Sequence, residues 1–491
     1  MQQKTKKITF LSIVLFTVGS TIGSGIFIKN STILKYNQGE LLGTSLSWIL
    51  ALVAFFALAL TLVEVCQGAK EENANGIPGW CKTYNNNFFA KAAKNFTLWI
   101  YLPTNYFFMP LYAIDQISES TGWDIPWWAG ITIGLALTFY FILTSGRSAH
   151  ISAIQNNVIT SVKFIPLVFC CIIGFVALGM NKEIVDHTSI EKSASYFINL
   201  APILGIGLSI PAIFFSFDGF YCSTSLYDKL EKKNAFTKGM IVGLLIVSVI
   251  YIFCSISLIL LNIDGSLEEG ELVPNWLSII LNICITIGIF GILNGFSFYG
   301  TMIFYDAIKN GEIFFSKKLQ KYTTNENTNV GMYYSLTVCT IFFIIYSVIG
   351  CFFYDDYQIY APTDSTNIVF GQILTACDAL SNWSSLIIFL FITCAGIGCA
   401  TKRNNPKFGI KKTWYFFPCI IISSIFCIGC FGLICTQTVY DLTFYLVVEN
   451  NKSLEKLLNY ITPLIILLIY TLATIIPSVW YKKEKSVALK K

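Results

Sequence analysis

Charged side chains are scarce in this sequence. Asp, Glu, Lys and Arg make up 12% of the 491 residues, whereas hydrophobic residues make up 55%. A soluble domain draws roughly a quarter of its residues from those four charged types. Half that fraction leaves too few charges to hydrate a globular surface. A soluble globular protein is therefore excluded, and a chain that lies mostly within a lipid bilayer is favoured.

Residues that usually build catalytic, metal and nucleic-acid sites are also missing. His150 and His187 are the only histidines, and the Cys427/Cys430 pair has apolar neighbours and no further ligand nearby in the sequence. We therefore predict no metal site, no cofactor and no enzymatic activity. The net charge of +5 is spread over short basic loops rather than a basic stripe, so no nucleic-acid partner is expected. No GxxxxGK[ST] loop is present, which argues against an ATP-driven pump.

Long uncharged stretches are abundant instead. A membrane helix needs about 20 apolar residues to cross the hydrocarbon layer, and none of the stretches alternates like a strand of a membrane barrel. We predict an all-α integral membrane protein with twelve transmembrane helices and no loop long enough for a separate domain. The stretches are Ile8–Ile28, Thr44–Val63, Asn95–Ile114, Ile125–Gly146, Phe164–Asn181, Ser193–Phe217, Gly239–Ile263, Leu272–Tyr305, Thr328–Tyr354, Ala379–Thr401, Thr413–Tyr440 and Asn459–Tyr481.

The basic residues predict the orientation. With the N-terminus in the cytoplasm, 26 of the 33 Lys and Arg residues fall on cytoplasmic segments and 6 on outer loops, among them Lys29 and Lys35. Lys and Arg accumulate on the cytoplasmic side of membrane proteins. We therefore predict a protein of the plasma membrane with a cytoplasmic N-terminus (1–7) and a cytoplasmic basic tail (482–491). Whether Cys351 and Cys377, beside a predicted outer loop, form a disulfide is left open.

The first predicted span contains a run of small residues, Gly19–Phe27 (GSTIGSGIF). Three glycines make a poor helix interior, since each costs about 1 kcal/mol relative to Ala. Two interpretations stand. The run is either a small-residue face for helix packing, as in GxxxG, or a local unwinding. Membranes tolerate unwinding only where the backbone is sheltered by protein or lines a cavity.

The sixth predicted span is interrupted in a similar way at Phe214–Phe220 (FFSFDGF). A charged residue such as Asp218 within an apolar run costs free energy in the membrane, so it marks a functional site by default. The alternative is that the span simply ends at Phe217. If residues 8–180 and 193–401 are two inverted five-helix repeats, followed by two further helices in 413–481, the two interruptions occupy matching places. Such a pair is the best sequence indication of a transporter site.

A half-helix also has groups that suit a particular ligand. Its N-terminal N–H groups attract a carboxylate, and its C-terminal carbonyls attract an ammonium. An amino acid carries both groups. We therefore predict an amino acid transporter, with a polyamine or other organic-amine carrier of the same fold as the alternative.

Several segments together resemble the amino acid–polyamine–organocation (APC) transporter superfamily. They are Gly19–Phe27, Ser152–Pro166 (SAIQNNVITSVKFIP), Phe215–Phe220 and Asp306–Lys318 (DAIKNGEIFFSKK). The resemblance implies a leucine-transporter-like fold of two inverted five-helix repeats plus two helices, working by alternating access on a small-molecule substrate. The number of subunits is not indicated.

The resemblance also implies residue roles. The substrate site would comprise Thr21, Ile22, Gly23, Ser24, Gly25, Ile26, Phe215, Ser216, Phe217, Asp218 and Gly219. The N–H groups around Ser24, Gly25 and Ile26 would bind the carboxylate, and the carbonyls of Thr21, Ile22, Phe215 and Phe217 the amine. Phe215 resembles the aromatic gate of the family. Asp218 stands where many relatives have an apolar residue, and would either favour cationic substrates or hydrogen-bond to the broken helix ends.

Lys163 falls within the fifth predicted span. Its ammonium either snorkels back to the headgroups or points inward to the broken helix, where it would replace a sodium ion as in relatives with a lysine at this position. We predict the second, and hence sodium-independent transport by proton coupling or exchange.

Five polar residues in other spans are weaker candidates. Glu64 is assigned to an inner-gate network, whereas Tyr101, Asn105, Asn294 and Ser297 would line the cavity or form interhelical hydrogen bonds.

Overall fold

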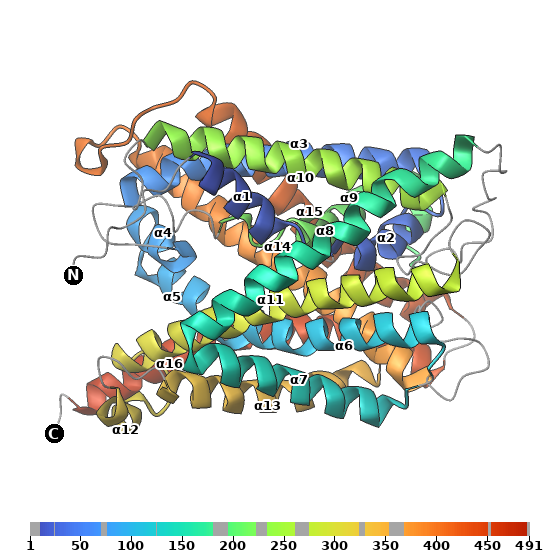
Figure 1. Cartoon of the computed structure of the whole chain (residues 1–491). Helices are drawn as coiled ribbons and strands as arrows, with labels where there is room; N and C mark the ends of the chain where they lie inside the picture. The colour runs from blue at the N-terminus through green and yellow to red at the C-terminus, as the bar shows by residue number, and fades with distance from the viewer. Residues whose placement is uncertain are drawn as a thin grey trace.

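Helices run side by side along the molecule (Figure 1). The computed structural model describes residues 10–23, 25–69, 76–123, 125–179, 195–221, 233–260, 274–323, 329–352, 368–449 and 453–488, and every regular element within these ranges is a helix. Helices α4 and α12 lie at one end of the bundle, on the left in Figure 1. We call this the α4 end and the other the opposite end.

The α-helices are α1 (Phe10–Thr21), α2 (Gly25–Tyr36), α3 (Leu41–Ala69), α4 (Gly76–Tyr84), α5 (Asn87–Phe96), α6 (Leu102–Thr121), α7 (Trp127–Arg147), α8 (Ala149–Gly179), α9 (Pro202–Ser216), α10 (Lys233–Leu260), α11 (Asn275–Lys309), α12 (Ser316–Leu319), α13 (Asn329–Gly350), α14 (Ile368–Lys402), α15 (Phe416–Val448) and α16 (Leu454–Ala488). A π-helical turn, η2 (Thr97–Tyr101), joins α5 to α6. The 3₁₀ turns are η4 (Ile198–Leu200), η6 (Gln320–Tyr322) and η8 (Pro406–Phe408).

Within the described ranges, nine helices are long and apolar enough to cross a membrane. They are α3, α7, α8, α10, α11, α13, α14, α15 and α16. The pair α1 and α2 meets the same criteria as one span, bent by 47° at a short break. Of the other two predicted spans, one contains α9, a shorter apolar helix of 15 residues, and the other overlaps α6, which does not meet the criteria.

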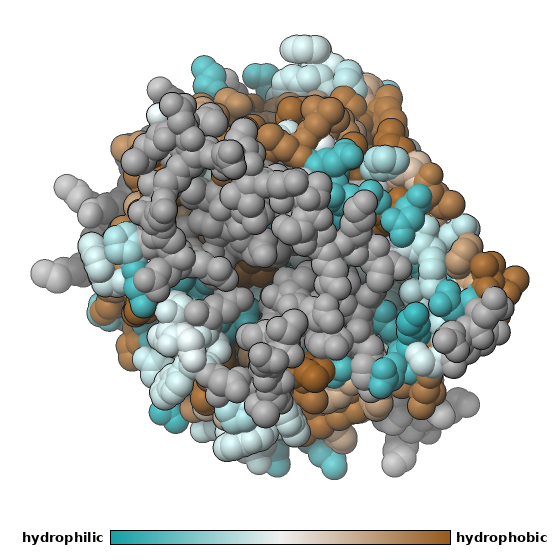
Figure 2. Space-filling model, turned by 90° about the vertical axis from the view of Figure 1, so that its right-hand side faces the viewer, coloured by the Kyte–Doolittle hydropathy of each residue, from teal (hydrophilic) through white to brown (hydrophobic). Residues whose placement is uncertain are grey.

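Apolar side chains cover the outside of the bundle. On α15, Ile421, Ile425 and Ile428 are each more than half exposed, whereas Cys427 and Cys430 on the other face are buried. Figure 2, seen from the opposite end, shows hydrophobic residues around the rim of the molecule. Such a surface is unfavourable in water and suits lipid. The protein therefore spans a membrane many times.

Two lysines contradict the predicted end of the first span. Lys29 and Lys35 were assigned to an outer loop, but both lie in α2, which continues to Tyr36; Lys29 is fully buried and Lys35 is 4% exposed. The prediction was wrong because a lysine interrupts an apolar run in the sequence, whereas in the fold a carboxylate from a distant helix neutralises Lys29. Cys351 and Cys377 are both free thiols.

Close helix packing depends on individual glycines. A Cβ added at Gly174 in α8 would lie 2.0 Å from the backbone oxygen of Ser257 in α10, and the Gly174 N–H donates to Ser257 Oγ at 2.8 Å. Backbones approach this closely only where a side chain is absent.

We expect Gly174→Ala to destabilise the protein by about 1–3 kcal/mol, because the methyl group forces α8 and α10 apart. Thermal unfolding in detergent, followed with a thiol-reactive dye on the many buried cysteines, measures the change. The matched control is Gly429→Ala in α15, where an added Cβ meets no atom within 4 Å. Equal melting temperatures for the two variants would contradict this account of the packing.

Candidate functional site

The first helix breaks within its glycine-rich run. α1 ends at Thr21 and α2 begins at Gly25, with Ile22 and Gly23 in non-helical backbone between them; Ser24 lies outside the described residues. Because Gly25 and Ile26 begin a helix, their N–H groups have no acceptor within it. The unwinding interpretation of the Gly19–Phe27 run therefore describes this segment better than an unbroken packing face.

In the sixth predicted span, helix α9 ends at Ser216. The N–H groups of Phe217 and Asp218 donate to the carbonyls of Phe214 and Phe215 at 3.0 and 3.1 Å, and Gly219 follows with φ +97°. That conformation favours glycine. Residues 222–232 lie outside the described ranges.

The two breaks touch each other. A Cβ at Gly25 would lie 2.7 Å from the Cα of Ser216, and one at Gly219 would lie 2.6 Å from the carbonyl oxygen of Ser20. Only residues without a side chain permit these approaches. The described predicted substrate residues of the two segments therefore lie side by side, and we call this contact region the patch.

Tyr251, from α10, joins the two breaks through its hydroxyl. The N–H of Gly23 donates to Tyr251 Oη at 3.2 Å, while the hydroxyl faces the carbonyl oxygens of Ser216 at 3.0 Å and Thr21 at 3.3 Å. The hydroxyl has one proton to share between these two acceptors. Sequence reasoning missed this residue, since it is a tyrosine in an ordinary apolar span.

Lys163 points inward. Its Nζ donates to the carbonyl oxygens of Gly19 at 2.6 Å and Ile22 at 2.7 Å, at the C-terminal end of α1. These carbonyls carry the negative end of the helix dipole. Of the two interpretations of Lys163, the snorkelling one is wrong.

Asp218 lies between the breaks and two further helices. Its Oδ2 accepts from the hydroxyls of Tyr101 (2.7 Å) and Ser385 (3.0 Å), and its Oδ1 accepts from the Gly219 N–H (2.8 Å). Tyr101 Oη also lies 3.0 Å from Tyr221 Oη. All these donors are neutral, and no cation pairs with Asp218 in the described part of the chain. Ser385, in α14, was not predicted.

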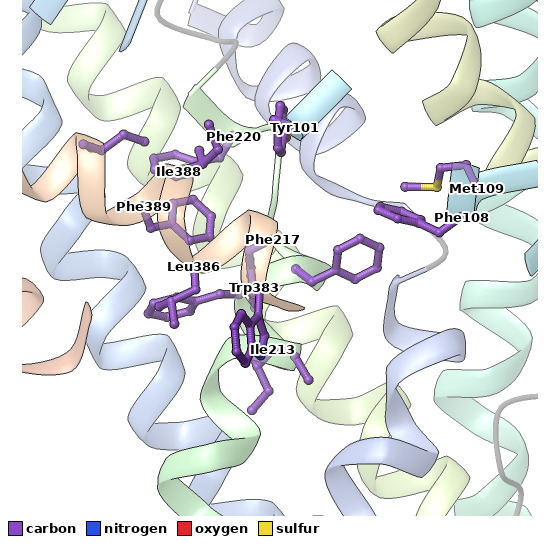
Figure 3. Packing of buried hydrophobic residues seen from close by; sticks show 14 of the residues in the cluster. Tyr101, Phe108, Met109, Ile213, Phe217, Phe220, Trp383, Leu386, Ile388 and Phe389 are labelled. Carbon is purple, nitrogen blue, oxygen red and sulfur yellow. The ribbon is translucent and has the colours of Figure 1, made fainter. Parts of the chain in front are cut away.

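Aromatic rings surround the patch. Phe217 and Phe220 each lie 4.5 Å from Phe55 between ring centroids, and Figure 3 shows these two with Phe389 on one side and Phe108 on the other. Phe215 packs edge-on against Phe108 at 5.5 Å. The aromatic rings make the surroundings of the peptide groups at the breaks apolar, which strengthens the electrostatic attraction of any unpaired group there for a charged ligand.

A buried ion pair lies next to this aromatic cluster. Lys29 Nζ is 2.6 Å from Asp378 Oδ1 in α14 and 4.9 Å from the ring centre of Phe215. The Tyr112 hydroxyl donates to the same Oδ1 at 2.6 Å, and Thr32 donates to Oδ2 at 2.9 Å. Sequence reasoning missed this pair because the predicted spans were ended at its charged residues.

A second ion pair joins α3 to the connection between α14 and α15. Glu64 is fully buried, and Arg403 donates to its two carboxylate oxygens from Nε (2.7 Å) and Nη2 (2.9 Å). The Thr413 N–H donates to the same carboxylate at 2.6 Å. Glu64 is thus the centre of a polar network, and its assignment to an inner gate stays a prediction.

The remaining candidates take different places. Asn105, in α6, donates to the carbonyl of Tyr101 in the preceding turn η2 at 2.7 Å. Asn294 accepts from Ser145 Oγ at 2.6 Å and donates to the Ser152 carbonyl at 3.0 Å, so it links α11 to α7 and α8. Ser297 is fully buried in α11. Asn294 therefore fits the interhelical alternative.

The sequence was compared with known proteins. Residues 8–470 match the amino acid permease family. The chain belongs to this family. The resemblance to the APC superfamily is thereby confirmed, and the protein is a multi-pass membrane permease with a small-molecule substrate.

Individual relatives agree with this assignment. An uncharacterized protein of Mycoplasma pneumoniae is 30% identical, over 97% of this chain and 94% of the relative. The serine/threonine exchanger SteT of Bacillus subtilis is 24% identical, over 59% of this chain and 65% of its own. The crystal structure of MhsT in complex with L-phenylalanine has a TM-score of 0.52 at 12% identity and covers 89% of this chain and 100% of its own. The permease therefore shares the MhsT fold.

We expect Tyr251→Phe to lower transport roughly tenfold, equivalent to about 1.4 kcal/mol, because both breaks lose their shared hydrogen-bond partner. Initial uptake rates in proteoliposomes, normalised to reconstituted protein, measure the effect. Tyr346→Phe is the matched control, since this fully buried hydroxyl contacts Thr104 at 3.1 Å and neither break. An equal loss of transport in both variants would contradict the claim that Tyr251 matters because it bonds to both breaks.

Proposed function

We propose that this permease is a secondary active transporter that moves amino acids across the plasma membrane by alternating access. The observation that carries the proposal is the contact between the break in the first span and the end of α9, which brings backbone donors and acceptors from two helix ends together at one place. We further propose that the chain has twelve transmembrane helices in two inverted five-helix repeats plus two, with both termini in the cytoplasm.

The substrate carboxylate would bind at the start of α2, where the N–H groups of Gly25 and Ile26 point out of the helix. The amine site differs from the sequence-based expectation. The carbonyls of Thr21 and Ile22 already face Tyr251 and Lys163, respectively. The carbonyl of Phe215 likewise accepts from the Asp218 N–H. We therefore propose that the amine relies mainly on the peptide carbonyl of Phe217, directly after α9, together with the nearby carboxylate of Asp218.

Lys163 supports sodium-independent transport. The carbonyl oxygens at the end of α1 are suitable ligands for a cation, and the Lys163 ammonium already lies 2.6 and 2.7 Å from two of them. A fixed positive charge there repels a metal cation. We propose that coupling is by exchange or by protons, and the name of the SteT relative makes serine and threonine the first substrates to test.

The two ion pairs suit a gating role. Lys29 and Asp378 connect α2 to α14 beside Phe215, and Glu64 and Arg403 connect α3 to the segment after α14. We propose that opening the site to one side separates the first pair and that opening it to the other separates the second. Each pair breaks only if both charges are rehydrated, since an unpaired buried charge is strongly unfavourable.

Uptake by proteoliposomes tests the function. We expect labelled L-serine or L-threonine to accumulate with a pH gradient or with internal unlabelled amino acid, and the rate to stay unchanged when choline replaces sodium at fixed pH and potential. Empty liposomes are the control. A collapse of uptake in choline would refute sodium independence, and no uptake of any amino acid in a full panel would refute the proposal itself.

Asp218 favours one alternative, a carrier for polyamines or other organic amines, because its carboxylate has no cationic partner in the described part of the chain. The variant Asp218→Asn keeps the shape and removes the charge. For an amino acid permease, we expect threonine uptake to fall less than about tenfold and putrescine not to be carried. Putrescine uptake by the wild type, abolished in the variant, would favour the amine carrier.

A further inference from the structure

A cavity of about 150 Å³ lies among α2, α9, α14, α15 and α16, apart from the helix breaks. None of the predicted substrate residues lines it. Its polar lining includes Thr32, Lys35, Asp378, Asn382, Gln437 and Asp441. Pockets for drug-sized ligands start at roughly 300 Å³, so this cavity suits a smaller molecule.

Asp441 gives the cavity a negative charge. It is 5% exposed, and its carboxylate accepts from Ser195 Oγ at 2.7 Å and from the Phe197 N–H at 2.8 Å. No lysine or arginine pairs with it in the described ranges. A carboxylate within a membrane protein is expensive when only neutral groups compensate its charge. A bound ammonium group would complete the site.

Asn382, on α14, supplies an unused polar group at the same cavity. It is 5% exposed, and its Oδ1 has no hydrogen-bond partner among the described residues. A buried amide oxygen without a donor is unfavourable. A ligand N–H group in the cavity would satisfy it.

Lys35 adds the opposite charge to the lining. It is 4% exposed and belongs to α2, whereas Asp441 belongs to α15. A cavity lined by both signs of charge matches a molecule that carries both signs. Asp378 also borders the cavity and pairs with Lys29. A ligand here would thus contact the residue that connects α2 to α14.

We propose that this cavity is a second binding site for a free zwitterionic amino acid, with its ammonium at Asp441 and Asn382 and its carboxylate towards Lys35. The amino acid class rests on the proposed function, whereas the site itself rests on the cavity and its lining. Asp378 both borders this cavity and pairs with Lys29. Binding of an amino acid in the second site therefore alters how readily α2 separates from α14.

Binding stoichiometry tests this proposal. The full chain is placed in nanodiscs of phosphatidylcholine and phosphatidylglycerol, and labelled L-threonine is titrated by equilibrium dialysis. We expect two molecules per wild-type chain and one per chain for Asp441→Asn, with the KM for uptake within about threefold of wild type. Asn382→Leu, which replaces the amide by an apolar side chain of similar shape, is a second variant should Asp441→Asn fail to fold. Glu455→Gln, an exposed carboxylate on α16, is the control and keeps two sites.

The outcomes separate the two proposals. One threonine per wild-type chain, with uptake intact, overturns the second site and leaves the proposed function standing. Two per chain in both Asp441→Asn and Asn382→Leu overturns it as well. No binding together with no uptake of any amino acid overturns both. If phosphatidylethanolamine in the nanodiscs displaces the second threonine, the site takes a lipid headgroup and the assignment to a free amino acid is wrong.

Discussion

Peptide groups that leave a helix inside a bilayer must find partners within the protein, because lipid offers none. This constraint governs the segment between Thr21 and Gly25 and the segment after Ser216. Tyr251 and Lys163 supply most of the observed partners, from α10 and α8. The N–H groups at the start of α2 have no acceptor within their helix, and these are the groups that we propose for the substrate carboxylate. The site is thus defined as much by its structural hydrogen bonds as by its free groups.

Charges inside the bundle follow the same constraint. Lys29 is fully buried, yet it is surrounded by a carboxylate, two hydroxyls and an aromatic face. Glu64 is likewise saturated by Arg403 and Thr413. Both ion pairs connect segments that are far apart in the sequence. A buried pair is weak evidence for stability but a good device for specifying a discrete state.

Sequence reasoning worked where the signal is local and failed where it is not. Gly19, Gly23 and Gly25 lie within seven positions, so the weakness of the first helix is visible in the sequence alone. The extension of α2 past Ile28 was missed because Lys29 resembles a loop residue until Asp378, 349 positions later, is placed beside it. Tyr251 and Ser385 were not predicted for the same reason, since nothing in the sequence next to them distinguishes them from other residues in apolar spans. Asn294 was recognised only as a polar residue within a span, and only the packed structure shows that it hydrogen-bonds to α7 and α8.

Phe215 lies between the helix breaks and the Lys29–Asp378 ion pair. The Lys29 ammonium lies over the Phe215 ring. Phe215 also directly precedes Ser216, and the carbonyl of Ser216 faces the Tyr251 hydroxyl. A substrate that displaces this ring therefore disturbs the surroundings of the Lys29–Asp378 pair, and separation of that pair leaves the ring without its cation. Such mutual dependence requires no long pathway, because every step is a direct contact between neighbouring residues. It gives the occupancy of the helix breaks a physical route to the contact between α2 and α14.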